Sequence, residues 1–278
     1  AAHVLDKNDV VVPAFRENGV YILRGMPMSE LYQYWGGDER GMKNCKKYNM
    51  FPVCITVGEQ PLHAVGYALA TKIKKEQRVV LTFFGDGATS EGDFHEAMNF
   101  AGVFKLPLVF VCQNNQWAIS VPVHQQTASS TIAQKAIAYG FKGIKVDGND
   151  VFGMYAALKE AMENARKNVP TLIESFTFRM ADHTTADDAS RYRSPALVQE
   201  WKKKDPVERL RLYLQKKKLW TTTYEDSVHK KVQKQVEEAV AAYEAILPQP
   251  PEEMFKHVYA EMPAILKLQL EEFLRGRA

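Results

Sequence analysis

The sequence predicts an α/β fold, doubly wound, with a mostly parallel sheet and a helical extension at the C-terminal end. Two apolar runs, residues 78–84 and 108–112, lack the polar alternation of half-exposed strands. Such runs are typical of strands buried on both faces, as in a parallel sheet. Between them, residues 91–104 repeat apolar side chains at helical spacing. Strand, helix and strand in this order indicate a doubly wound domain.

The remaining elements of the sheet domain have weaker signals. Strands are expected at residues 142–146 and 171–178, with a helix over 151–166 between them. A helix rich in small residues is expected at 63–70, where Gly66 would let another backbone approach closely. We therefore expect this helix to be tightly packed or to lie at an interface.

The composition changes before residue 180. Residues 180–193 are polar and without periodicity, which predicts a long exposed loop that is mobile without a ligand. Ser194 followed by Pro195 is typical of a helix start. Further helices are expected over residues 196–204, 206–217, 224–246 and 263–274. We divide the chain into an α/β domain at 1–193, which ends in the loop, and a helical extension at 194–278.

Composition narrows the classes of partner. A net charge of +3 over 278 residues does not predict a nucleic-acid-binding surface. No apolar run approaches the ~18 residues that span a bilayer, so we expect no membrane partner. Three cysteines without metal-type spacing favour a reducing compartment. The N-terminus lacks the pattern of a secretory signal, and we expect a further segment to precede it.

Polar groups follow the ends of both strong strands. Gly85, Asp86 and Gly87 follow the first run, and Asn114 and Asn115 follow the second. Ligands of such sheets bind beyond the carboxyl ends of the strands. Glycines and a helix start can hold a phosphate group, and carboxylate and amide oxygens are ligands that Mg²⁺ prefers. Together they predict a site for a diphosphate and a magnesium ion.

The spacing of these groups resembles the thiamine diphosphate (ThDP) signature. The string GDGATSEGDFHEAMNFAG…NNQWAIS…VDGNDV is similar to the α subunits of 2-oxo acid dehydrogenase E1 components. The resemblance covers essentially the whole chain, including residues 187–193. It implies decarboxylation of a 2-oxo acid, with pyruvate favoured, and transfer of the acyl group to lipoyl-E2. Branched-chain 2-oxo acids (2-oxoisovalerate) and acetoin are the alternatives within the family.

The resemblance also implies site residues by position. Mg²⁺ ligands are implied at Asp86, Asn115 and the carbonyl of Trp117. Contacts to the cofactor are implied at Phe15, Arg16, Val57, Gly87, Ala88, Ile119 and His183. Phe15 stands where the family usually has a tyrosine, so it is expected only to pack. His183 is implied as the catalytic residue, and the ordinary pKa of an imidazole suits proton transfer. Thr184 occupies a position that is phosphorylated in some members.

The resemblance further implies partners. The acid that activates the cofactor comes from a second α/β domain in this family, and no second set of strands follows residue 178. An E1 β subunit is therefore expected to complete the site in an α₂β₂ heterotetramer, with the lipoyl domain of E2 as a further partner. The expected location is the cytoplasm for a bacterial-type chain and the mitochondrial matrix for a eukaryotic one. Two readings from other classes remain open: a non-catalytic scaffold subunit and a Mg²⁺-dependent phosphotransferase that uses Asp86 alone.

Overall fold

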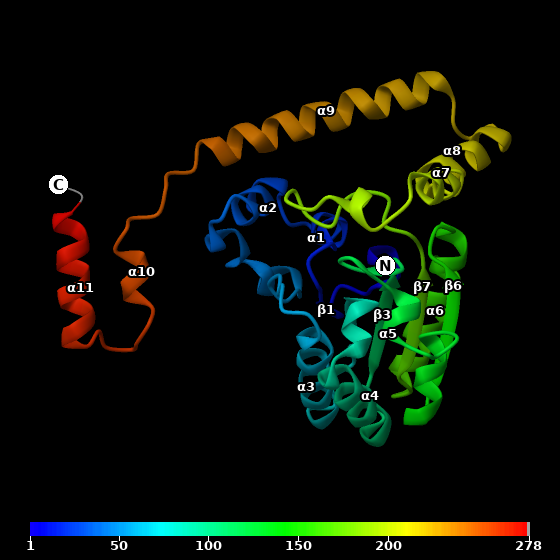
Figure 1. The fold of residues 1–278 in the computed structure, drawn as a ribbon, viewed down its shortest axis with the longest axis horizontal. Helices are drawn as coiled ribbons and strands as arrows, with labels where there is room; N and C mark the ends of the chain where they lie inside the picture. The colour runs from blue at the N-terminus through cyan, green and yellow to red at the C-terminus, as the bar shows by residue number, and fades with distance from the viewer. Residues whose placement is uncertain (277–278) are drawn as a thin grey trace.

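A five-stranded parallel sheet forms the centre of the computed structural model, which describes residues 1–276 (Figure 1). The strand order is β1-β2-β3-β7-β6, and all four neighbouring pairs are parallel. The strands are β1 (Val10–Val12), β2 (Val80–Gly85), β3 (Leu108–Asn114), β6 (Lys142–Asp147) and β7 (Thr171–Phe176). The predicted α/β fold with a parallel sheet is confirmed.

Helices cover both faces of the sheet. On one face lie α3 (Glu59–Ile73), α4 (Gly92–Phe104) and the 3-10 helix η5 (Ala133–Tyr139). On the other lie α1 (Asn18–Leu23), α2 (Met28–Trp35), α6 (Val151–Arg166) and the 3-10 helices η2 (Glu39–Met42) and η3 (Cys45–Tyr48). Alternate strand residues feed the two cores, as with Phe110 toward α4 and Val111 toward α6. The fold is therefore doubly wound, as predicted.

The edge strand β1 was not predicted. Its three valines are followed by Pro13, so the apolar run is too short to be distinguished from a loop. All three are buried, because β1 pairs with β2 through Val10↔Val80 and Val11 bridges to Met50 on its other side. Burial here comes from neighbours that are distant in the sequence.

A partly buried ion pair holds the N-terminal segment against the sheet. Asp9 is fully buried and accepts hydrogen bonds from the main-chain nitrogen of Val79 at 2.8 Å and from Arg166 Nη2 at 2.7 Å. Arg166 ends α6. Since Val79 directly precedes β2 and Arg166 ends α6, these contacts hold both elements beside β1.

Helix α3 has one free side. Gly66 is exposed, with nothing within 4 Å of the place of a Cβ atom, and Ile73 is 71% exposed. Beside it, Val103 of α4 is 67% exposed. The expectation of tight packing around Gly66 is wrong within this chain, and the alternative of an interface stays a prediction.

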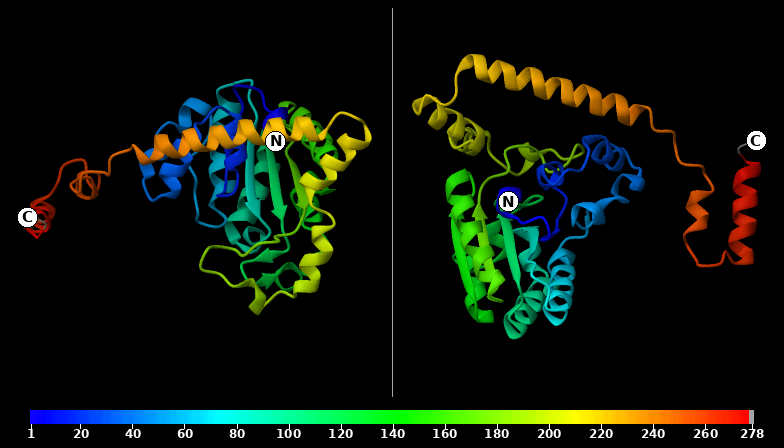
Figure 2. Two further views of the ribbon diagram at one scale, coloured as in Figure 1. Left: turned by 90° about the horizontal axis from the view of Figure 1, so that it is seen from above. Right: turned by 180° about the vertical axis from the view of Figure 1, so that it is seen from behind.

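After the sheet domain the chain is helical. The helices are α7 (Pro195–Lys202), α8 (Pro206–Lys216), α9 (Thr222–Glu244), α10 (Glu253–Lys256) and α11 (Ala264–Arg275). Ser194 caps α7 and Pro195 is its first residue, as predicted. Figures 1 and 2 show α9 crossing above α1 and α2, with α10 and α11 lying beyond the sheet domain. Among residues 1–276, no helix has the length and apolar character required to cross a bilayer.

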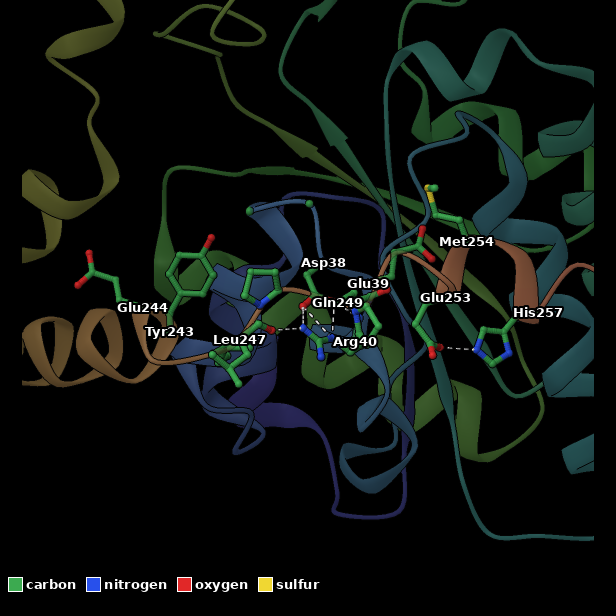
Figure 3. Close-up of a pocket in the computed structure, with 15 residues that line it drawn as sticks. Asp38, Glu39, Arg40, Tyr243, Glu244, Leu247, Gln249, Glu253, Met254 and His257 are labelled. Atoms are coloured by element: carbon green, nitrogen blue, oxygen red, sulfur yellow. Dashed lines mark hydrogen bonds and ion pairs between the residues drawn. The ribbon is translucent and has the colours of Figure 1, made fainter. Parts of the chain in front are cut away.

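The end of α9 and the segment after it meet the sheet domain around η2. Arg40 donates to Asp38 and to the carbonyl of Leu247 at 2.7 Å, and Gln249 donates to Asp38 at 2.6 Å (Figure 3). The Arg40 guanidinium holds the pKa of Asp38 well below its ordinary value. A pocket of about 1120 Å³ opens here, lined mainly by residues 36–40 and 243–250. None of its lining residues was predicted to bind the cofactor.

Candidate cofactor site

The ends of β2 and β3 bring the predicted metal ligands to one edge of the sheet. The strands are paired up to Gly85↔Gln113, so Asp86 and Asn115 follow neighbouring strands within one or two residues of the last pair. Asp86 is 1% exposed, and its Oδ2 accepts a hydrogen bond from Gln126 Nε2 at 3.0 Å. Gln126, from the short helix α5 (Val123–Gln126), was not predicted to belong to the site.

The turn after Asp86 is shaped for close backbone approach. It forms the 3-10 helix η4 (Gly87–Ser90). Thr89 closes it, since its main-chain nitrogen and its hydroxyl donate to the Asp86 carbonyl at 3.0 and 2.8 Å. A Cβ atom on Gly87 would lie 2.8 Å from Cβ of Ala118. The absence of a side chain at Gly87 is therefore required, and a phosphate could reach the turn's N–H groups.

The turn after β3 carries the other predicted ligands. Asn115 Oδ1 accepts from the main-chain nitrogen of Trp117 at 3.1 Å, which folds the amide over its own turn. Gln116 and Ile119 have φ values of +71° and +52°. A non-glycine residue with positive φ is uncommon and often marks a functional turn. Trp117 lies in the two-residue strand β4 (Trp117–Ala118), which pairs with β5 (Val121–Pro122).

Two residues from the N-terminal segment meet the loop after β7. Arg16 Nη2 lies 3.2 Å from Nδ1 of His183, although 167 positions separate them. The Phe15 ring packs edge-on against the His183 ring, with 6.3 Å between centroids, and Arg16 lies over Phe15. The structure therefore brings the predicted residues Phe15, Arg16 and His183 together, with Phe15 in a packing position.

Arg179 organises this loop and was not predicted. It is 7% exposed and donates to the carbonyl of Ile119 at 2.7 Å and to the Tyr192 hydroxyl at 2.6 Å. Its Nη1 lies 3.4 Å from Nδ1 of His183. Asp187 accepts from the His183 main-chain nitrogen at 2.8 Å. Arg179 thus joins the loop histidine to the turn that carries Ile119.

Arg193 anchors the other end of the loop. It is 7% exposed and donates to the carbonyls of Arg179 and Met180, the latter at 2.8 Å. Arg191 and Thr184 are exposed. The polar composition of the loop concealed the difference between the two arginines, because the sequence does not reveal which one is buried.

Positive charge gathers around His183. Burial, followed by the charges of Arg16 and Arg179, lowers the pKa of the imidazole, and Asp187 opposes the shift. Partial burial of the guanidinium and the charge of Arg179 lower the pKa of Arg16 as well. The two guanidinium groups of Arg16 and Arg179 both lie beside His183 and form a favourable place for an anion such as a diphosphate.

Asp86 is a suitable ligand for a divalent cation. Burial raises its pKa, and hydrogen bonds from Gln126 and nearby main chain oppose the rise. A cation beside the carboxylate would favour the ionised form. Among residues 1–276, no group of three His, Cys, Asp or Glu could hold a metal. The predicted set has one carboxylate, one amide and one carbonyl, and it fits Mg²⁺, which usually keeps phosphate and water ligands.

Val57 lies on an open loop. It is 53% exposed, so it is not a core valine of this chain. The following residue, Gly58, has a φ of +94°, and a Cβ atom there would lie 3.1 Å from the Glu91 side chain. The Val57 loop therefore runs beside Glu91, the residue that follows η4.

Comparisons with known proteins agree on one family. The model of the family described as "Dehydrogenase E1 component" matches residues 1–252. The chain is 46% identical over 276 residues to the 3-methyl-2-oxobutanoate dehydrogenase subunit alpha of Mycobacterium tuberculosis, covering 98% of this chain and 74% of that protein. It is 42% identical over 280 residues to the pyruvate dehydrogenase E1 component subunit alpha of Acholeplasma laidlawii (98% and 79% covered). For the Bacillus subtilis subunit of that name, identity is 39% over 269 residues (96% and 72% covered).

Proposed function

Because the chain belongs to the dehydrogenase E1 component family, as an α subunit of a 2-oxo acid dehydrogenase, we propose that its strand-end site holds the diphosphate of ThDP through Mg²⁺. One observation carries the proposal. The buried Asp86 and the Asn115 turn follow neighbouring parallel strands, beside a glycine turn that excludes a side chain. The cofactor, when bound, supplies the chemistry that cleaves the bond between the carboxyl group and the keto carbon.

The residues of this chain have separate roles in the proposal. Asp86, the Asn115 amide and the Trp117 carbonyl would hold the metal, and Gly87 with Ala88 would offer main-chain N–H groups to the diphosphate. Arg16 would bind a diphosphate oxygen, for which a planar guanidinium is suited.

His183 would hold or move a proton during acyl transfer. Its lowered pKa keeps the imidazole neutral at neutral pH, so that it can accept a proton. Val57 and Ile119 would contact the apolar parts of the cofactor. Both side chains are apolar and more than half exposed, so a ligand can reach them.

A second chain is part of the proposal. E1 α subunits of these complexes work with a β subunit and with E2 in general. We infer an α₂β₂ assembly for this chain, in which the β subunit supplies the carboxylic acid that activates the cofactor.

The relatives are named for two different substrates. The relative at 46% identity is named for 3-methyl-2-oxobutanoate and those at 42% and 39% for pyruvate. We propose the branched-chain acid as the first substrate to test and pyruvate, which the sequence alone favoured, as the second candidate. Comparing kcat/KM for both acids on the assembled enzyme decides between them.

Calorimetry with ThDP tests the proposed site. We expect weak binding to the chain alone and tight, Mg²⁺-dependent binding to the assembled enzyme. Replacing Asp86 with Asn keeps the side-chain shape and should weaken binding by about 100-fold, since the only carboxylate among the predicted Mg²⁺ ligands loses its charge. Failure of ThDP to bind the assembled enzyme would instead favour the hypothesis of a phosphotransferase or of a scaffold subunit.

The same Asp86→Asn variant has a stability signature. Because burial raises the pKa of Asp86, the free energy of unfolding falls as pH rises through its titration. The neutral amide removes this penalty but directs an N–H at one of the donors to Asp86, Gln126 or the main chain, so at pH 7 the melting temperature of the cofactor-free variant should change little. A large drop in its melting temperature would mean that lost folding, and not a lost ligand, explains the lost binding.

A further inference from the structure

Glu174 is a buried acidic residue that the cofactor-binding roles leave unexplained. It lies in β7 and is 1% exposed. Its two carboxylate oxygens accept separate hydrogen bonds, one from Asn114 Nδ2 at 2.8 Å and one from the main-chain nitrogen of Ala133 at 2.9 Å. Lys145 Nζ, on the edge strand, lies 4.0 Å from Oε1. A buried carboxylate is costly to keep unless its acceptors are used, and here both oxygens are.

The first hydrogen bond leads to the metal-binding turn. Asn114 is 3% exposed and precedes the proposed ligand Asn115. While its Nδ2 donates to Glu174, its Oδ1 accepts from the main-chain nitrogen of Gln116 at 3.1 Å. Gln116 holds the positive φ that turns the chain toward Trp117. The Asn114 amide is thus oriented by Glu174 and in turn supports this strained residue.

The second hydrogen bond leads to the phosphate-binding turn. Ala133 begins η5, and two residues later Lys135 Nζ donates to the carbonyl of Thr89 at 3.0 Å. Thr89 closes the turn on Asp86. The Glu174 carboxylate holds η5 against β7. The Glu174 side chain is therefore connected to both turns, through Asn114 to one and through η5 to the other.

We propose that Glu174 is a positioning residue that sets the geometry of both cofactor-binding turns through Asn114 and η5. The inference rests on the proposed function and deepens it. Glu174 accepts hydrogen bonds from Asn114 and Ala133, and no hydrogen bond among the described residues joins it to a predicted metal ligand or diphosphate contact. Its effect should therefore fall on the affinity for Mg²⁺-ThDP, with kcat near that of the unmodified enzyme at saturating cofactor.

A donor–acceptor exchange tests the bond between the two side chains. In Glu174→Gln, either orientation of the amide directs an N–H donor at another donor, Asn114 Nδ2 or the Ala133 nitrogen. In Asn114→Asp, two carboxylates face each other. The double variant Glu174→Gln/Asn114→Asp satisfies every group, because the amide donates to the carboxylate and its oxygen accepts from Ala133.

The measurement is the Kd of Mg²⁺-ThDP on the full chain assembled with its partner. We expect each single variant to weaken binding by about tenfold or more, as outer-shell partners of metal sites do, and the double variant to recover most of the loss. Ile173→Val is the matched control. It shortens a buried side chain of β7 in the core on the opposite face, and should leave the Kd unchanged while lowering the melting temperature.

Each outcome of these measurements either supports or overturns the role proposed for Glu174. Unchanged affinity in Glu174→Gln, a loss in Ile173→Val of similar size, or no recovery in the double variant overturns the inference. If the single variants do not fold, a double variant that folds and binds supports it, and one that does not fold overturns it. No binding by the unmodified assembled enzyme removes the proposed function and the inference together, whereas normal binding by it and by Glu174→Gln removes the inference alone.

Discussion

At the scale of single residues, Arg179 shows how one buried cation controls a histidine. It contacts His183, Tyr192 and the carbonyl of Ile119, and its charge contributes to the lowered pKa of His183. An imidazole whose folded-state pKa lies below its unfolded value near 6.5 favours folding in its neutral form. The loop contacts are therefore complete above about pH 6.5 and weaken as the pH falls through the lowered folded-state pKa.

Replacing Arg179 with Gln should move the pKa of His183 up toward its ordinary value and lower kcat/KM by about tenfold, which is 1.4 kcal/mol of lost positioning. Both the lost charge and the looser burial act in this direction. NMR titration of the His183 ring measures the pKa. Arg191→Gln is the control, because Arg191 is an exposed arginine of the same loop. A His183 pKa that stays low in Arg179→Gln would contradict the assigned role.

At the scale of elements, the 23-residue helix α9 contacts α2 of the sheet domain near its C-terminal end. None of its residues is buried, yet Tyr243 lies 6.4 Å from Tyr32 between ring centroids and fills the space above Gly36. Gly36 has a φ of −77°, so its role is space and not backbone conformation. A Cβ atom there would meet the Tyr243 hydroxyl.

We expect Gly36→Ala to displace α9 from α2, at a cost of about 1–3 kcal/mol for overpacking. Hydrogen exchange of the α9 amides should become faster, while exchange in the sheet stays slow. Gly19→Ala serves as the control, since nothing lies within 4 Å of a Cβ atom at that position. The second change Tyr243→Ala in the Gly36→Ala background should remove the clash, and no difference between these two variants would refute the contact.

At the scale of the whole molecule, exposed apolar side chains occur on several elements, and two of these surfaces, on α3–α4 and on α11, bear on assembly. The side of α3 and α4 that carries Ile73 and Val103 is open to solvent, and α11 has no buried residue. Large exposed apolar patches mark sites of interaction in soluble proteins. Both surfaces are consistent with a subunit that works in an assembly, as its family does.

Introducing a charge on the α3–α4 side should therefore impair assembly and leave folding intact. We expect Ile73→Lys and Val103→Lys to weaken association with the partner chain by at least about tenfold, because interface cores exclude charge. Size-exclusion chromatography with light scattering measures the assembly. Val207→Lys, at a 75% exposed position of α8, is the control. Normal assembly of both variants would place the interface elsewhere.

The sequence alone determined the central strands and the two strand-end turns. The runs that became β2 and β3 are mostly apolar, and Asp86 and Asn115 follow these strands directly, so the signal lies within a few residues. The α/β fold followed from that local pattern, and the E1 family followed from a resemblance that covers essentially the whole chain. The roles of Asp86, Asn115 and the other site residues remain predictions until binding is measured.

Only the tertiary structure decided which distant residues meet. Arg16 reaches His183 across 167 positions, and β1 is buried by β2 and Met50. Glu174 and Arg179 look like ordinary surface residues in the sequence, yet both are buried, with their polar atoms paired. The physical reason is that the burial of a polar side chain depends on partners contributed by other elements, which no local pattern encodes.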